Sequence, residues 1–175
     1  MKPLDLILAV KLSLYENEAD WTFRQLSQDL QVNISTIHKS YNNLKNSSLV
    51  IYGFINLSGL FEFIKHGVRY VFPVQLGEDQ KGIKAGRSNI IFSSKIATRY
   101  EMVWESPSGE CIGRSYQPLH PSLLKSWSHD SRFKDMIDLI DVLRLTDCRA
   151  RDRNLAHQVL EEMILSKKYN MEKSS

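Results

Sequence analysis

The chain has 175 residues, of which 42% are hydrophobic and 25% charged, and its formal net charge is +3. This composition is that of a globular protein with a substantial core, and it excludes a largely disordered chain. No apolar run reaches the roughly 20 residues of a membrane span, and residues 1–10 lack the features of a signal peptide. Two cysteines are too few for a disulfide framework, so we expect a reduced, cytoplasmic protein without a cofactor.

Residues 3–15 predict a helix with Pro3 in its first turn. Two apolar stripes run along this helix, and a surface that broad needs cover on two sides. We expect the cover to come either from other elements of the same chain or from a second copy in a dimer. The stripes consist of Leu4, Leu8, Leu12 and Tyr15, and of Ile7, Val10 and Leu14.

Two short capped helices follow, at about residues 23–31 and 34–46. The first has a capping box made by Thr22 and Gln25. The second starts after Asn33 as the N-cap. Two such helices joined by a tight turn form an αα unit. The second helix is expected to bury one stripe, made of Ile34, Ile37, Tyr41 and Leu44.

The remainder of the chain predicts an α+β protein. A module at residues 1–56 is followed by a small mixed α/β domain at residues 57–175 that ends in two amphipathic helices. The expected elements are a short β ribbon at 49–56, a helix at 57–66 stopped by Gly67, a strand at 68–74, a loop at 76–88, strands at 100–104 and 110–116 joined by a type I turn, and helices at 131–145 and 147–166.

Residues 23–44 resemble the helix-turn-helix of bacterial winged-helix regulators, the MarR-like group among them. The segment Ser47 to Val50 is similar to that family's exit into the wing. Two positions depart from the family pattern, with Ser27 where Ala is usual and Gln31 where Gly is usual. The predicted wing is also short. The resemblance implies a winged helix-turn-helix DNA-binding domain at residues 1–56 and a dimeric transcriptional regulator.

The exposed face of the helix at residues 34–46 is predicted to contact double-stranded DNA. An α-helix fits the major groove, and Asn can pair with adenine through two hydrogen bonds. No Asp or Glu lies between Gln31 and Phe61, so phosphates meet no repulsion there. The alternative is a surface helix that is rich in Ser and Asn for solubility. The predicted base-reading residues are Ser35, Thr36, His38, Asn42 and Asn43, and the predicted phosphate contacts are Thr22, Arg24, Lys39 and Lys45.

Charged residues also cluster in the second half of the chain. Residues 80–99 contain five cations and no acid, which indicates either a second patch for phosphates or an anionic effector, or, as we favour, a solvated basic surface. An acidic stripe on the helix at 131–145 is interpreted as its solvated face. Acids and arginines at 147–153 are interpreted as local salt bridges. The cations are Lys81, Lys84, Arg87, Lys95 and Arg99; the acidic stripe is Asp135, Asp138 and Asp141; the alternating charges are Asp147, Arg149, Arg151, Asp152 and Arg153.

We expect neither an enzyme nor a metal site, because there is no HExxH or GxSxG motif and the histidines have no ligand spacing with Cys111 or Cys148. Residues 66–73, 118–122 and 149–156 also look similar to segments of small prokaryotic helix-turn-helix proteins of unassigned role, which implies a fixed second domain. The first functional hypothesis is therefore a homodimeric DNA-binding regulator. The second is an antitoxin or adaptor that docks a protein encoded nearby, favoured by the near-neutral charge of the first fifty residues and the short wing.

Overall fold

The computed structural model describes residues 1–16, 20–88, 100–126 and 130–172. Its fold is mixed α+β, as the sequence predicts. Among the described residues, no helix combines the length and the apolar character that crossing a membrane requires.

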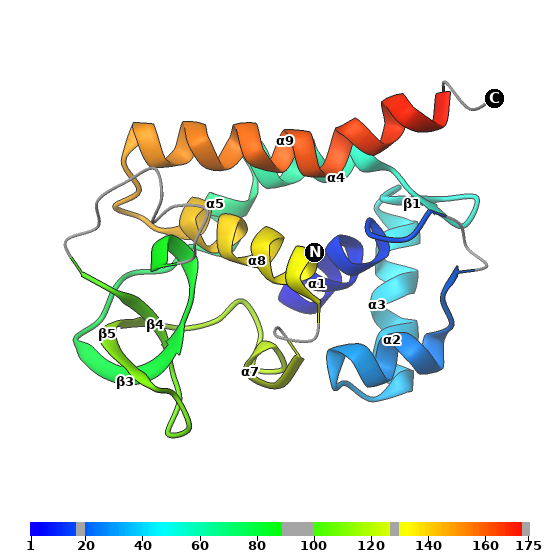
Figure 1. Cartoon of the computed structure of the whole chain (residues 1–175). Helices are drawn as coiled ribbons and strands as arrows, with labels where there is room; N and C mark the ends of the chain where they lie inside the picture. The colour runs from blue at the N-terminus through cyan, green and yellow to red at the C-terminus, as the bar shows by residue number, and fades with distance from the viewer. Residues whose placement is uncertain (17–19, 89–99, 127–129, 173–175) are drawn as a thin grey trace.

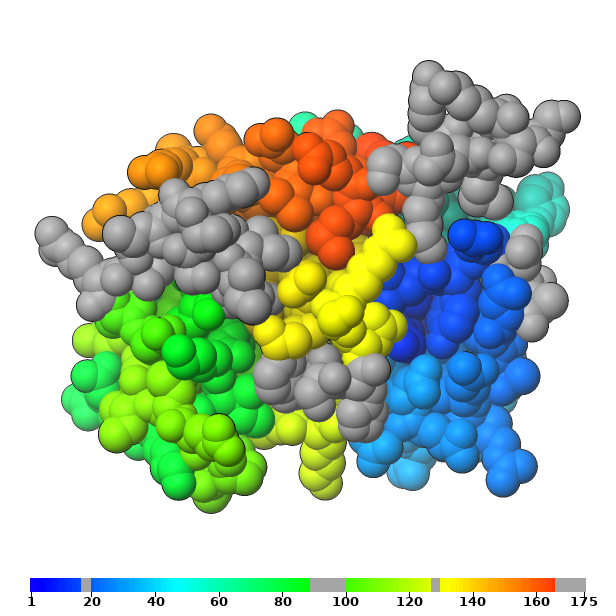
Figure 2. All heavy atoms as spheres, viewed as in Figure 1, coloured from blue at the N-terminus to red at the C-terminus, as the bar shows by residue number. Residues whose placement is uncertain are grey.

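Three parts lie side by side in the molecule (Figure 1). Helices α2 (Phe23–Leu30) and α3 (Ile34–Asn46) form one end, and a small group of strands forms the other. Helix α8 (Ser131–Arg144) lies between the two ends, beneath the long helix α9 (Ala150–Glu172). The space-filling view shows the same order across the surface of the molecule (Figure 2).

Helix α1 (Pro3–Leu12) is buried all round, from Leu4 to Leu12. It packs against α3 on one side and α8 on the other, so the cover for its two apolar stripes comes from its own chain. The helix is shorter than predicted, because it ends at Leu12 rather than near Tyr15. A single hydrophobic cluster contains residues from both sides of position 56. The division of the chain at that position stays a prediction.

Helices α2 and α3 have the predicted boundaries within one residue. The Thr22 hydroxyl accepts a hydrogen bond from the Gln25 N–H at 3.1 Å, which confirms the cap. Gln31 occupies the turn with φ 53° and ψ 44°, the left-handed conformation in which glycine is favoured. Asn33 stands at the N-cap of α3, but its side chain makes no capping hydrogen bond. The prediction that Ile34 is buried is wrong, because this residue is 45% exposed.

The predicted ribbon is confirmed as two very short strands, β1 (Val50–Ile51) and β2 (Phe54–Ile55). They pair antiparallel, and a two-residue turn with positive φ at Tyr52 and Gly53 joins them. Such a turn matches the twist of a tight hairpin. Helix α4 (Leu57–His66) follows at once, as predicted, because the Asn56 side chain caps it by accepting the Gly59 N–H at 3.0 Å.

The prediction of a strand at residues 68–74 is wrong. Gly67 has φ −105° and continues into a second short helix, α5 (Val68–Val71), instead of stopping α4 in a left-handed conformation. Val68 is fully buried where α5 packs against α4 and α8. Tertiary packing therefore overrides the β propensity of the valines. Within residues 68–74, Val74 alone forms a β-bridge, which is parallel and pairs with Leu145.

Strands β3 (Asp79–Lys84), β4 (Met102–Glu105) and β5 (Cys111–Tyr116) close into a small barrel. Strand β3 runs antiparallel to both of the others, which pair parallel with each other. The predicted strands at β4 and β5 are confirmed, whereas the loop predicted at 76–88 is wrong over residues 79–84, which form β3. Gly82 in β3 allows the neighbouring strand to approach closely, because a Cβ atom at this position would collide with the Trp104 carbonyl group.

The two predicted terminal helices are confirmed as α8 and α9, although α9 begins at Ala150 rather than at Asp147. Asp130 caps α8 by accepting the N–H groups of Arg132 and Phe133, both at 3.1 Å. Its other oxygen accepts a hydrogen bond from Lys11 Nζ at 3.1 Å, which ties α8 to α1. One carboxylate thus links the first helix to the C-terminal half of the chain.

We predict that Asp130→Asn lowers stability at neutral pH and flattens the acid side of the stability curve. Burial opposes ionisation of Asp130, but the Phe133 N–H and Lys11 outweigh it and hold the pKa of the carboxyl below its usual value. A lowered pKa in the folded state contributes stability above the unfolded pKa, near 4, and that contribution disappears as the pH falls through the folded pKa. Since the group is one-third exposed, we expect a loss of about 1 kcal/mol or less at pH 7.

Urea unfolding of both proteins at pH 7 and pH 3 measures this effect. Because Asn is as good an N-cap as Asp, the substitution isolates the charge. An equal difference between the two proteins at both pH values would contradict the prediction.

Candidate DNA-binding face and buried polar network

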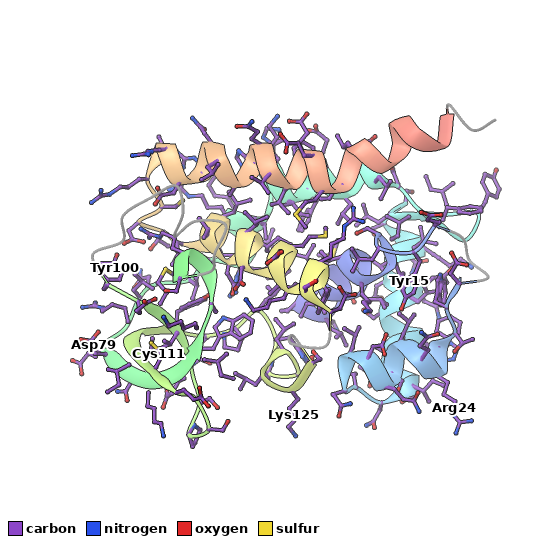
Figure 3. All side chains as sticks on the ribbon, viewed as in Figure 1. Tyr15, Arg24, Asp79, Tyr100, Cys111 and Lys125 are labelled. Carbon is purple, nitrogen blue, oxygen red and sulfur yellow. The ribbon has the colours of Figure 1, made fainter. Side chains whose placement is uncertain are left out.

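The outer face of α3 carries short polar side chains and cations. Ser35, Thr36, Lys39, Asn42 and Lys45 are all exposed, as predicted. Arg24 is exposed on the adjoining α2 and points away from the molecule (Figure 3). Among the described residues, no carboxylate pairs with any of these cations. The face is therefore polar and positively charged.

Two acids near this face are engaged elsewhere. Asp5 is only 2% exposed, and it accepts a hydrogen bond from Ser40 Oγ at 2.6 Å. Asp29 lies on the other side of α2, where it pairs with Lys11 at 3.5 Å and accepts a hydrogen bond from the Tyr15 hydroxyl at 3.3 Å. The outer face of α3 therefore has cations and no carboxylate of its own, while the exposed Asp20 lies before the start of α2.

Two of the predicted base-reading residues have contacts within the protein. The Asn43 amide donates to both oxygens of Asp5, at 3.2 and 3.3 Å, so this side chain is turned toward α1. The His38 ring stacks on Phe23 with the ring centroids 3.8 Å apart. Asn43 therefore serves mainly to hold α3 on α1, and His38 joins α3 to α2. Both residues remain solvent-exposed in part.

Of the five cations predicted as a second basic patch, the three that the structure describes do not form one surface. Arg87 is buried and pairs with Asp152 at 3.3 Å and Asp147 at 3.6 Å, so the prediction of a surface contact there is wrong. Lys84 pairs with Glu101 at 3.0 Å, while Lys81 is exposed on β3. The other two predicted members, Lys95 and Arg99, lie outside the described residues.

The acidic stripe of α8 is mostly buried, which corrects its interpretation as a solvated face. Asp141 is 0% exposed and accepts hydrogen bonds from Trp104 Nε1 at 2.9 Å, from the Tyr116 hydroxyl at 3.0 Å and from Arg144. Asp138 accepts the Gly86 N–H at 2.7 Å and pairs with Lys134 at 3.2 Å. These carboxylates fasten the barrel to α8.

Burial dominates the chemistry of this network. It raises the pKa of the Tyr116 hydroxyl well above its usual value, and the nearby carboxylates act in the same direction. Burial also raises the pKa of Asp141, against the opposing effect of Arg144. Tyr116 therefore remains a hydrogen-bond donor at all moderate pH values. The hydrogen-bond partners of Asp141 among the described residues all come from the protein core.

Asp147 and Asp152 both pair with Arg87 of the short 3-10 turn η2 (Gly86–Ser88), a partner that the interpretation as local salt bridges did not include.

The buried acids of α8 had a signal in the sequence. Apolar residues stand directly before and after both Asp138 and Asp141, which indicates that this part of the helix lies within the core. The contacts between Asp5 and α3 had no such signal.

Within the described residues, no three His, Cys, Asp or Glu side chains gather in a way that could hold a metal ion. Comparison with protein-family models, with curated proteins and with solved structures finds no match for the chain. The function has to be argued from the chemistry of its own surfaces.

Proposed function

We propose that the chain binds double-stranded DNA through a winged helix-turn-helix made of α1, α2, α3 and the β1–β2 hairpin, and that it acts as a dimeric transcriptional regulator. The observation that carries this proposal is the outer face of α3, which is exposed, polar and free of acid, while Asp5 and Asp29 are bonded to other parts of the protein. An α-helix with such a face fits the major groove.

The side chains divide into two roles under this proposal. Ser35, Thr36 and Asn42 lie on the outer face of α3, where they would meet base edges, and Asn42 has the amide that pairs with adenine. Lys39 and Lys45 would contact phosphates. At the start of α2, Arg24 and the Thr22 hydroxyl would contact the DNA backbone, which the first helix of such a motif usually crosses.

Single substitutions on α3 separate the two roles. We expect Lys39→Gln to weaken binding to all sequences alike and to reduce the slope of log affinity against log salt by about 1. Asn42→Ala should instead weaken binding to the preferred site, by about 1–3 kcal/mol, with little change for random DNA. Fluorescence anisotropy with DNA from upstream of the chain's own gene and with a shuffled duplex, over a range of salt concentrations, measures both effects.

Lys81→Gln is the matched control for Lys39→Gln, because Lys81 is also exposed but lies on β3 at the opposite end of the molecule (Figure 1). Equal weakening by both lysine substitutions would reduce the interaction to general charge attraction. Equal affinity of the unmodified protein for the upstream and shuffled duplexes would overturn the proposal.

Docking of a partner protein is the second candidate, and the hairpin favours it. Three large apolar side chains are exposed there: Ile51 by 43%, Tyr52 by 94% and Phe54 by 52%. Aromatic side chains of this kind are common at the centres of protein interfaces. Co-purification of a stable partner that is lost on Tyr52→Ser, together with unchanged DNA affinity of that variant, would favour docking over DNA binding.

A further inference from the structure

A basic pocket opens where the end of α4 and the whole of α5 meet the first half of α9. Its volume is about 410 Å³, which lies in the range of roughly 300–1,000 Å³ that small-molecule sites occupy. Five basic side chains from these three helices line it, and none of them belongs to the proposed DNA-binding face. They are Lys65, His66, Arg69, Arg153 and His157.

Cations from different helices meet at this pocket. Lys65 and Arg69 stand four residues apart across the α4–α5 junction, and Arg153 comes from α9. Like charges held close together repel each other. Arg153 also lies in the first turn of α9, where the positive end of the helix dipole disfavours a cation. A bound anion would relieve both unfavourable effects.

No carboxylate lines this pocket in the part of the chain that the structure describes. Glu62 lies 3.4 Å from His66, but both side chains are more than 60% exposed. Burial lowers the pKa of His157, and Lys65, Arg153 and His66 lower it further, against a smaller opposing effect of Glu161. The imidazole of His157 is therefore within the electrostatic reach of cations on both walls.

The pocket also has an apolar floor. Ile64, Val68 and Leu143 lie at its base and are almost completely buried, so they leave little surface open to a ligand. Tyr70, which is 78% exposed, adds an aromatic ring to the lining. A ligand with an anionic group and an apolar body could contact the basic side chains with the first and the Tyr70 ring with the second.

We infer that this pocket binds a small organic phosphate. Arg69 and Arg153 would hold the phosphate, since a guanidinium group matches its oxygens with two parallel N–H groups. Arg69 donates one N–H to the Thr146 carbonyl oxygen at 3.5 Å and keeps others for a ligand. Lys65 adds a third positive charge, and the body of the ligand would lie against the Tyr70 ring. The inference is independent of the proposed function.

Isothermal titration calorimetry with phenyl phosphate and with inorganic phosphate tests the inference. We expect phenyl phosphate to bind more tightly than inorganic phosphate, and Arg153→Gln and Lys65→Gln each to weaken phenyl phosphate about tenfold, the usual loss for one charged hydrogen bond. Salt of about 150 mM limits the contribution of distant charges, because the Debye length is then about 8 Å.

The matched controls are Arg149→Gln and Lys125→Gln, which make the same chemical changes outside the pocket lining. Lys125 extends from helix α7 (Leu123–Ser126) on the side of the molecule opposite α9 (Figure 3). We expect less than a twofold effect from either control. Equal weakening by the pocket and control variants, or no heat with either phosphate, would overturn the inference.

NMR titration of the His157 imidazole gives a second readout. A phosphate favours the protonated form of a nearby imidazole, so saturating phenyl phosphate should raise the pKa of His157 from its lowered value. Lys65→Gln should raise the pKa of His157 in the absence of ligand, because it removes one of the cations that lower it. An unchanged pKa at saturating phenyl phosphate would place the ligand elsewhere and overturn the inference.

Discussion

Asp141→Ala is expected to lower the free energy of unfolding by about 3–5 kcal/mol, the usual cost of removing one partner from a buried ion pair. The carboxylate is fully buried and accepts hydrogen bonds from Trp104, Tyr116 and Arg144. Without it, the partners that the described residues leave to the buried Arg144 are the Phe72 and Gln117 carbonyl oxygens, at 3.0 and 3.4 Å. The barrel would also lose its main polar attachment to α8.

Urea denaturation followed by tryptophan fluorescence measures the loss, since Trp104 itself belongs to the network. Asp135→Ala is the matched control, because Asp135 belongs to the same acidic stripe on the same helix but is only half-buried. We expect the control to cost about 1 kcal/mol or less. Similar losses for the two variants would show that the buried network of Asp141 contributes no more stability than a half-buried charge on the same helix.

Asp5→Ala is expected to cost about 2–3 kcal/mol, because it leaves the buried Ser40 hydroxyl and two partly exposed donors without their acceptor. Asp5 accepts hydrogen bonds from Ser40 Oγ, from the Asn43 amide and from the Lys2 N–H at 2.7 Å. It thus caps α1 and fixes α3 against it. The same substitution should weaken DNA binding about tenfold if α3 is the reading helix, because α3 would lose the contact that sets its position.

Asp29→Ala is the control for Asp5→Ala, since Asp29 belongs to the same part of the chain but is only partly buried and bonds α1 to α2. We expect it to cost less than about 1 kcal/mol. The two readouts of Asp5→Ala separate two questions. A stability loss without a change in DNA affinity would support the packing role of Asp5 and count against α3 as the reading helix. A negligible stability loss would contradict the packing role itself.

Local signals in the sequence predicted residues 22–66 well. The Thr22 cap, the start of α4 after Asn56 and the short hairpin around Gly53 each depend on residues within a few positions of one another. The preferences of caps and turns are expressed in the same local backbone that the structure contains. For this reason the boundaries of α2 and α3 and the exposure of most of the α3 face follow from the sequence.

The errors lie where distant segments decide the outcome. Residues 79–84 form a strand only because β4 and β5 supply hydrogen-bonding partners on both sides, and Gly82 allows them to approach. Val68 lies in a helix because α8 buries it there. Neither partner is visible in the local pattern of residues.

The same distinction applies to the charged groups. By itself, the sequence determined that α3 carries an acid-free row of polar side chains, because helical spacing alone sets which residues share a face. Only the tertiary structure decided that Asp5, Arg87 and Asp141 are buried and paired. It also brought Lys65 and Arg69 together with Arg153 across one pocket. Burial and pairing depend on neighbours that are distant in the chain, and a single helix pattern carries no record of them.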